Sequence, residues 1–434
     1  MFKTFINAFK IKDIRKKILM TLLLIVIYRL GCFIPIPGVN VALLSEAVQS
    51  YDILGFLDLL TGSSFSQFTL FAMGISPYIT ASIILQLLTI AIPSLERLSK
   101  EEDGREKIER ITRYTGIGLA LVQSIGIFVG LQNSAKPGTS YLASNLPDWM
   151  ALAVIGICAT AGTAILMWLG ERITEKGIGN GISMLIFASI VSRVPQTVIG
   201  WVQQLFTGVM KVWAFAILLV LIVGMITLVV YVDQAQRRIP VQYAKRVVGR
   251  KMYGGQSTYL PIKANANGVM PLIFAMTILQ VPGMIGQFWP KGKFYTFVST
   301  YLSPATTNIA GIIIYYVLYA IMIVGFAYFY SSITFNPVEI SKNLQQNGGF
   351  IPGIRPGRPT SDYLQKKCSR LTMFGALFLM IIAIIPTLLL KVLNITVLSA
   401  FGPTSILIMI SVSIEIADQL DSLMIMRNHK GFLN

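Results

Sequence analysis

The segment VWAFAILLVLIVGMITLVVYV, residues 212–232, runs for 21 residues without a charged side chain. A helix needs about 20 mostly apolar residues to cross the hydrocarbon core of a bilayer. Because no water is present there, a lipid-exposed backbone must satisfy its own hydrogen bonds, and a helix does this within one segment. The segment therefore predicts a membrane-spanning helix.

The whole chain has the composition of a membrane protein. It has 434 residues, of which 54% are hydrophobic and 13% charged, and a mean hydropathy of +0.68. A soluble domain carries about 25% charged residues. Ten apolar runs are predicted to span the membrane, at 18–36, 74–92, 113–131, 150–169, 182–200, 212–232, 268–288, 309–330, 371–390 and 395–416. The runs at 182–200 and 395–416 are the weakest predictions, because both contain polar residues.

The distribution of basic residues predicts the orientation of these spans. Of the 36 lysine and arginine residues, 29 lie in the two terminal tails and in alternate connections, chiefly the loops 233–263 and 332–370. Basic connections remain on the cytoplasmic side of the membrane. We therefore expect both termini and both basic loops to be cytoplasmic. The first run is interpreted as a retained span, because no small-residue cleavage site follows it.

The ten spans divide into two sets of five around the connection 201–211, which gives the halves 1–205 and 206–434. An odd number of crossings in each half means that homologous halves would lie inverted in the membrane. Such repeats place a functional site between the halves at the midplane. The sequence shows no clear internal identity, so this symmetry is a hypothesis.

The connection 37–73 has no lysine or arginine and contains LGFLDLLTGSSFSQFTLFAMG, residues 54–74 at its end. This stretch is too polar to cross lipid alone and too apolar for a free loop. Irregular backbone at membrane depth is tolerated only inside protein or along a water-filled cavity. From the residues alone, a re-entrant element in a cavity and an amphipathic helix on the outer surface are equally good interpretations.

Several classes of chemistry find no support in the sequence. The three cysteines, Cys32, Cys158 and Cys368, lie far apart, and His429 is the single histidine. They suggest neither a disulfide framework nor a metal site. No GxSxG, HExxH or Walker lysine motif is present, and each of these motifs carries a specific catalytic or nucleotide-binding geometry. We expect no enzyme activity, no metal and no cofactor, and hence a driving force supplied by a partner.

The stretch GGFIPGIRPGRPT, residues 348–360, differs from its apolar surroundings in having four glycines, three prolines and two arginines. Proline fixes φ and glycine permits positive φ, so the stretch predicts a loop of defined shape. The other basic loop, 233–263, has seven basic residues and a single acidic residue, Asp233. Topology determination explains the charge of these loops, and attraction of anionic lipid is an alternative worth about 1 kcal/mol per basic residue.

Five segments of the chain together carry a family resemblance: YRLGCFIPIPG (28–38), FAMGISPYITASIILQLL (71–88), MWLGERITEKGIGNGIS (167–183), RRIPVQYAKR (237–246) and FNPVEISKNLQQNGGFIPGIRPG (335–357). In this order they resemble the SecY family of protein-conducting channels. The resemblance implies an all-α polytopic fold with ten transmembrane helices in two inverted five-helix halves around an hourglass pore. It also implies a channel that passes polypeptides across, or laterally into, the bacterial cytoplasmic membrane.

The resemblance further implies roles for particular residues. A ring of isoleucines at the constriction would comprise Ile75, Ile79, Ile186, Ile273, Ile278 and Ile408. A plug near 55–70 would include Leu60, Thr61, Gly62, Ser63, Ser64 and Phe65. A lateral gate between spans two and three on one side and spans seven and eight on the other would carry Gln86, Gln123 and Gln280. For each glutamine alone, a hydrogen bond between packed helices is an equally good interpretation.

Finally, the resemblance implies partners: the small membrane subunits SecE and SecG, the motor ATPase SecA, the ribosome, signal sequences and membrane lipids. The implied docking residues are Arg237, Arg238, Arg246, Arg250, Lys251, Arg355 and Arg358. A coupled secondary transporter is the competing function, since inverted halves would also suit it. Transporters usually carry charged groups within their spans, whereas here the span interiors hold almost none, which favours the channel.

Overall fold

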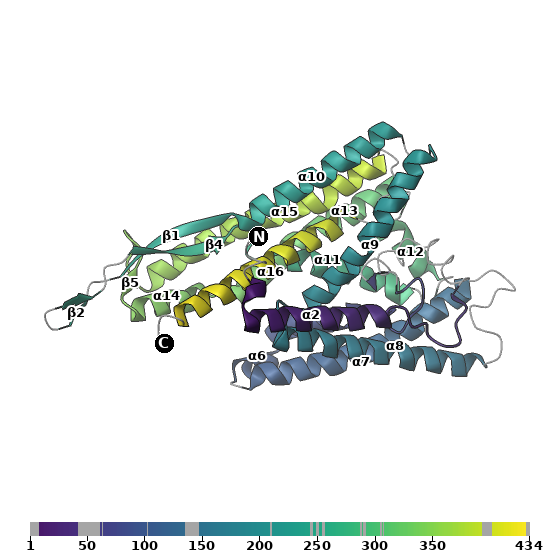
Figure 1. The fold of residues 1–434 in the computed structure, drawn as a ribbon, viewed down its shortest axis with the longest axis horizontal. Coiled ribbons are helices and arrows are strands. Elements are labelled where there is room, and N and C mark those ends of the chain that lie inside the picture. Colours follow the sequence, from purple (N-terminus) through teal and green to yellow (C-terminus); the bar gives the residue numbers. More distant parts are fainter. Residues whose placement is uncertain are drawn as a thin grey trace.

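The fold is seen in a computed structural model. The residues that it describes are 8–41, 61–62, 64–101, 103–134, 147–208, 211–243, 246–248, 251–253, 257–286, 289, 292–303, 306, 308–392 and 402–430. Within them the chain is built mainly from long helices packed side by side, with a small sheet at one end (Figure 1).

Each of the ten predicted spans coincides with a helix. In chain order these are α2 (Lys12–Gly31), α5 (Ser76–Ala91), α7 (Gly104–Ser134), α8 (Asp148–Lys176), α9 (Gly181–Phe206), α10 (Val212–Gln234), α11 (Met270–Gly286), α13 (Ile309–Thr334), α15 (Arg358–Val392) and α16 (Pro403–Lys430). Three shorter helices, α6 (Pro93–Lys100), α12 (Lys293–Tyr301) and α14 (Pro337–Gln346), lie in the connections.

Length and hydropathy identify six membrane-crossing helices among the described residues, and a seventh if α5 and α6 count as one span bent by 105°. The other three predicted spans correspond to α2, to the shorter apolar helix α11, and to α16. The chain is therefore a multi-pass helical membrane protein, and its helices are consistent with ten crossings. The weakly predicted run 182–200 lies within α9, which continues through Pro195.

Several predicted boundaries differ from the helix ends by a few residues or more, and two of these differences have a clear physical reason. The predicted run began at 371, whereas α15 begins at Arg358, because the first turns of this helix are polar and hydropathy does not detect them. The loop 332–370 thus includes α14 and the start of α15. At the other boundary, α16 begins at Pro403, in the first-turn position that proline favours. The predicted start at 395 lies outside the described residues.

The fold is mostly helical, as predicted, with one addition that the sequence analysis did not predict: the basic loop 233–263 forms a β-hairpin. Strand β1 (Gln236–Tyr243) pairs antiparallel with β4 (Ser257–Lys263), and β5 (Gly349–Phe350) extends β1 on its other edge. Two further short strands, β2 (Arg246–Val248) and β3 (Lys251–Tyr253), pair with each other. Alternate residues Ile239 and Val241 of β1 are buried, which is the period of a half-buried strand.

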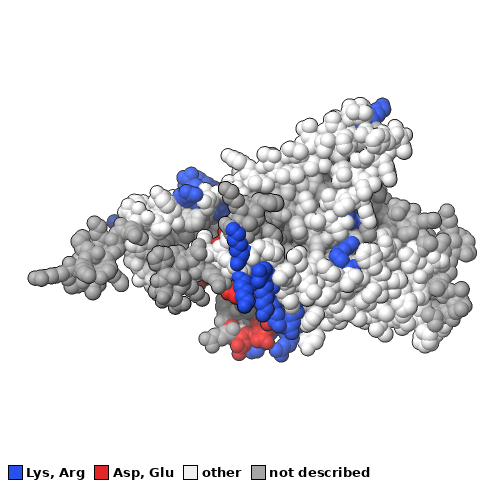
Figure 2. Space-filling view, in the orientation of Figure 1, with Lys and Arg blue, Asp and Glu red and all other residues white. Residues whose placement is uncertain are grey.

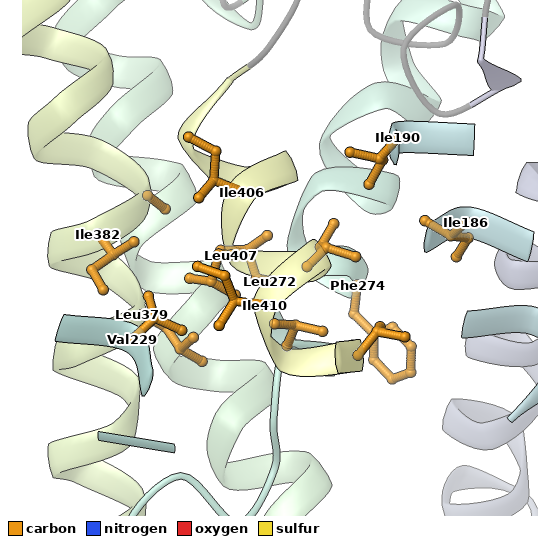
Figure 3. Close-up of a cluster of buried hydrophobic side chains, with 14 of the residues drawn as sticks. Ile186, Ile190, Val229, Leu272, Phe274, Leu379, Ile382, Ile406, Leu407 and Ile410 are labelled. Atoms are coloured by element: carbon orange, nitrogen blue, oxygen red, sulfur yellow. The ribbon is translucent and has the colours of Figure 1, made fainter. Parts of the chain in front are cut away.

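A single large apolar cluster joins most of the long helices, and Figure 3 shows its centre. Ile406, Leu407 and Ile410 of α16 lie there with Leu272 and Phe274 of α11, and all five are buried. Helix α16 also packs against α9 and α10, while α13 packs against α11 and α15. The sheet, α14 and the last turns of α16 lie together at one end of the molecule (Figure 1).

Candidate functional site

All six candidate isoleucines belong to the large apolar cluster or pack against it. Ile75, Ile186 and Ile408 are buried members of the cluster, and Ile79, Ile273 and Ile278 are partly buried and pack against it. They come from the start of α5, from α9, from α11 and from α16. Because α11 contacts α5 and α16 contacts α9, helices of the two sequence halves meet at this cluster.

Such a cluster has the chemistry of a seal. Isoleucine side chains exclude water, and an apolar constriction blocks ions by dewetting. Dispersion contacts between the side chains have little directionality, so the side chains can separate without leaving an unpaired polar group. An apolar collar of this kind can therefore close around a solvent path and also part for a wider object.

Most of the described part of the irregular segment that precedes α5 is buried. Thr61, Gly62, Ser64 and Phe65 are all buried, whereas the candidate plug residues Leu60 and Ser63 lie outside the described residues. Phe65 and Phe68 have no exposed surface, and the Phe68 ring lies 6.0 Å from the Phe128 ring of α7. This burial differs from that of an amphipathic helix on a surface and fits a segment enclosed by helices.

Two glycines allow the backbone of this segment to come close to its neighbours. A Cβ at Gly162 of α8 would lie 1.8 Å from the Leu70 carbonyl oxygen, so only glycine permits this contact. Gly62 has φ +65°, and a Cβ there would lie 3.0 Å from the Ser189 carbonyl oxygen of α9. Any other residue at position 62 would be strained as well as crowded.

Polar groups from α2 and α9 hold the same segment. The Tyr28 hydroxyl bonds to the Ser189 hydroxyl and donates to the Thr61 carbonyl at 3.4 Å. The Arg29 guanidinium donates to the Gly62 carbonyl at 3.4 Å. A charged residue in a membrane span is costly and faces protein or a cavity, and this contact shows that Arg29 faces the segment. The sequence placed Arg29 in a span without indicating its partner.

The three candidate gate glutamines have different surroundings. The Gln123 side chain of α7 donates to the Met284 sulfur of α11 at 3.9 Å, which bridges the two halves of the chain. Gln86 donates to Ser82 within its own helix, α5. Gln280 is partly buried on α11. Of the three, Gln123 therefore lies at the seam where α5 and α7 face α11.

Basic residues lie mainly across the middle of the molecule and near the sheet. Figure 2 shows a band of lysine and arginine side chains across the middle and a smaller group near the sheet, with only isolated ones on the helices away from the sheet. Arg237 and Arg238 are exposed on β1. Arg246 and Lys251 belong to β2 and β3, and Arg250 lies outside the described residues.

The glycine–proline loop at 348–357 has a defined shape, as its composition predicts. Gly348, Gly353 and Gly357 adopt positive φ values of 69°, 82° and 97°. The Ser341 hydroxyl of α14 donates to the Gly357 carbonyl at 2.7 Å, and the Thr360 hydroxyl of α15 donates to the Arg355 carbonyl at 2.9 Å.

The side chains of the loop differ in their exposure. Ile351 is buried in the small core beneath the sheet. Arg355 is exposed on the loop, whereas Arg358 is the first residue of α15. The loop thus presents Arg355 on a frame that is fixed at both ends.

Comparison with known proteins identifies the family. A model of the SecY family matches residues 69–417, most of the chain. The chain belongs to the SecY family. The protein translocase subunit SecY of Streptomyces coelicolor is 44% identical over 445 aligned residues and is matched over the full length of both chains. That of Aquifex aeolicus is 41% identical over 429 residues, with 98% of each chain covered.

Solved structures of SecY-type channels have the same fold. One described as a protein conducting channel has a TM-score of 0.67 at 21% identity, covering 94% of this chain and 91% of the other. Another, described as showing that the plug domain of SecY stabilises the closed state, has a TM-score of 0.65 at 20% identity with the same coverage.

If the segment after Thr61 is enclosed in the resting protein, its burial sets the reactivity of cysteines placed there. In a variant without Cys32, Cys158 and Cys368, we expect Ser64→Cys to react with a membrane-impermeant maleimide at least about tenfold more slowly than Gln67→Cys, because opening must precede reaction. Ser64 is 1% exposed, whereas Gln67, three residues away, is exposed. Equal labelling rates would contradict the enclosed position.

Proposed function

We propose that the chain is a protein-conducting channel that passes secretory polypeptides across the cytoplasmic membrane and membrane proteins laterally into it. The observation that carries this proposal is the apolar cluster in which helices of both halves meet, with a buried irregular segment beside it. The described members of the apolar cluster offer a small solute no charged group to bind. Together the cluster and the segment suit a wide path that is closed at rest.

In this proposal the halves 1–205 and 206–434 are inverted relative to each other, and the six isoleucines form the constriction. The collar prevents ion flow at rest because a narrow apolar passage does not hold water. A polypeptide passes by pushing the side chains apart. The segment that includes Thr61–Phe65 is the plug, held on the outer side of the collar by Tyr28, Arg29 and Ser189.

The lateral exit lies between α5 and α7 on one side and α11 and α13 on the other. Its closed state is supported by the Gln123–Met284 contact, whose length of 3.9 Å is that of a weak bond to sulfur. A weak contact of this kind suits a seam that opens for a signal sequence. Gln86 and Gln280 would then contact polar groups of the entering signal-sequence helix, or would face the lipid at the opening.

The driving force comes from partners on the cytoplasmic side. We propose SecA and the ribosome as these partners, docking on the β1–β4 hairpin and on the loop at 348–357, and SecE and SecG as small membrane subunits. Clustered arginine and lysine suit ribosomal phosphate, and a fixed loop loses little entropy when a motor binds it. A solved relative described as the channel in a canine ribosome-channel complex has a TM-score of 0.62. If the hairpin and the loop face the cytoplasm in this way, both termini are cytoplasmic as well.

The seal can be tested by making the collar polar. We expect Ile79→Ser combined with Ile278→Ser to produce a resting ion conductance in planar bilayers, because water then enters the constriction. The matched control is Ile157→Ser with Ile313→Ser, two isoleucines that are 66% and 58% exposed on the helix surfaces. A bilayer as tight with the collar variant as with the parent protein would remove these two residues from the ring.

The docking role of the loop can be tested at Arg355. We expect Arg355→Glu to leave insertion and subunit assembly intact and to lower SecA-driven translocation in proteoliposomes by about tenfold or more, as for a lost charge-assisted contact. Arg358→Glu should have a smaller effect because Arg358 lies in α15. Arg355→Lys should be intermediate, since it retains the charge without the planar fork. Translocation by the Glu variant at the parent rate, at equal channel density, would contradict the proposed contact.

A further inference from the structure

Asp233 is the single acidic residue of the basic loop 233–263. A basic docking surface does not account for it. It lies at the end of α10, where its side chain is 8% exposed. Burial of a carboxylate is costly unless hydrogen bonds compensate it. Its surroundings therefore indicate what this position does.

Two neutral groups from distant parts of the sequence satisfy the Asp233 carboxylate. The Asn265 side-chain amide donates to one oxygen at 2.8 Å, and the Ser411 hydroxyl donates to the other at 2.5 Å. Asn265 is the second residue after β4 and is itself buried. Ser411 lies on α16, one turn after Ile408. The carboxylate thus joins the base of the hairpin to a helix of the apolar collar.

The short connection that carries Asn265 is fixed on its other sides as well. The Ala264 amide donates to the Ala235 carbonyl at 2.8 Å, which closes the hairpin base. The Asn267 side chain donates to the Ala327 carbonyl of α13 at 2.7 Å. The backbone also passes Gly375 of α15 closely, since a Cβ there would lie 3.1 Å from the Ala264 carbonyl oxygen.

This connection leads directly into α11, which begins at Met270 and carries Ile273 and Ile278. The hairpin base is therefore covalently continuous with one collar helix and is hydrogen-bonded to another. Displacing it relative to α16 would leave a buried carboxylate short of a donor, which costs more than the loss of an ordinary exposed hydrogen bond.

We propose that Asp233, Asn265 and Ser411 form a polar clasp that makes the hairpin base and α16 move as one body. A load applied to the hairpin by a docked partner then reaches α11 and α16 together and draws the collar open. Asp233 is a positioning residue in this scheme, since it acts through α16. The inference rests on the proposed channel function and on docking at the hairpin.

A second interaction, an exposed ion pair, also connects the hairpin base to α16. Lys263 forms an ion pair with Asp418 of α16 at 2.7 Å, but both side chains are 54% exposed. Exposed ion pairs contribute little because water screens them. We therefore expect the coupling to depend on the buried clasp and very little on this pair, so Asp418→Asn, which breaks the pair without changing the docking hairpin, should behave like the parent.

The test separates coupling from docking by measuring both in proteoliposomes that contain the channel with its small membrane subunits. We expect Ser411→Ala to leave the affinity for SecA within about twofold of the parent and to lower the maximal translocation rate at saturating SecA by about tenfold, the effect of an unsatisfied buried partner. Ser411→Thr, which retains the hydroxyl, should restore the rate. Asn265→Ala should have the same effect, and the double variant should be no worse than either single variant, because both break one link.

Ser413→Ala is the matched control. Ser413 lies two residues further along α16, is also partly buried, and donates only to the Met409 carbonyl of its own helix. If the parent channel translocates and the Ser411→Ala variant reaches the same maximal rate, the clasp is overturned. The proposed channel function is then unaffected. An equal loss in Ser413→Ala, or a loss explained by weaker SecA binding, would also overturn the clasp. A parent channel that fails to translocate would count against the proposed function.

Discussion

The structure depends on one constraint: the hydrocarbon core of a membrane offers no hydrogen-bond partner to an exposed peptide group. Helices satisfy this within each segment, and the long helices of this chain do so. The stretch after Thr61 is not a regular helix, and it obeys the same constraint by being surrounded by α2, α7, α8 and α9. Close approach at Gly162 and Gly62 makes that enclosure possible, because helix and loop backbones touch where a side chain would hold them apart.

In the proposed channel, different kinds of contact hold the parts that would open and the parts that would transmit force. The bonds from Tyr28 to Thr61 and from Arg29 to Gly62 are 3.4 Å long, beyond the usual distance of a strong hydrogen bond. The isoleucine cluster is held by non-directional packing. At the hairpin base, in contrast, Asn265 and Asn267 make contacts of 2.8 and 2.7 Å. The proposal therefore assigns the releasable seal and the firm connection at the hairpin base to different interactions.

Much of this arrangement could be predicted from the sequence, because hydropathy and charge report directly on the membrane. The runs at 212–232 and 309–330 begin at the same residues as α10 and α13 and end within four residues of the ends of these helices. Hydropathy could not locate the start of α15 at Arg358, since the first turns of that helix are polar. The hairpin was missed although Ile239 and Val241 alternate with polar residues, because the pattern is short and Pro240 interrupts it.

The candidate site residues also differ in how far the sequence alone could identify them. The isoleucines were suggested by resemblance alone, since periodicity does not distinguish a pore-facing isoleucine from one that packs between helices or faces lipid. Asp233 could be recognised as exceptional by its charge. Its partners could not be named, because Ser411 lies 178 positions away in the sequence and only the packing of α10 on α16 brings them together.

The central claim is that a polypeptide passes through the isoleucine cluster, and crosslinking to a stalled precursor tests it most directly. A photoreactive side chain would replace Ile278 in one variant and Ile313, which is 58% exposed on α13, in another. With a secretory precursor arrested midway by a folded domain at its end, we expect strong crosslinks from position 278 and none above background from position 313. Crosslinks from position 313 alone, or from neither position while the precursor is demonstrably arrested in the membrane, would contradict the account.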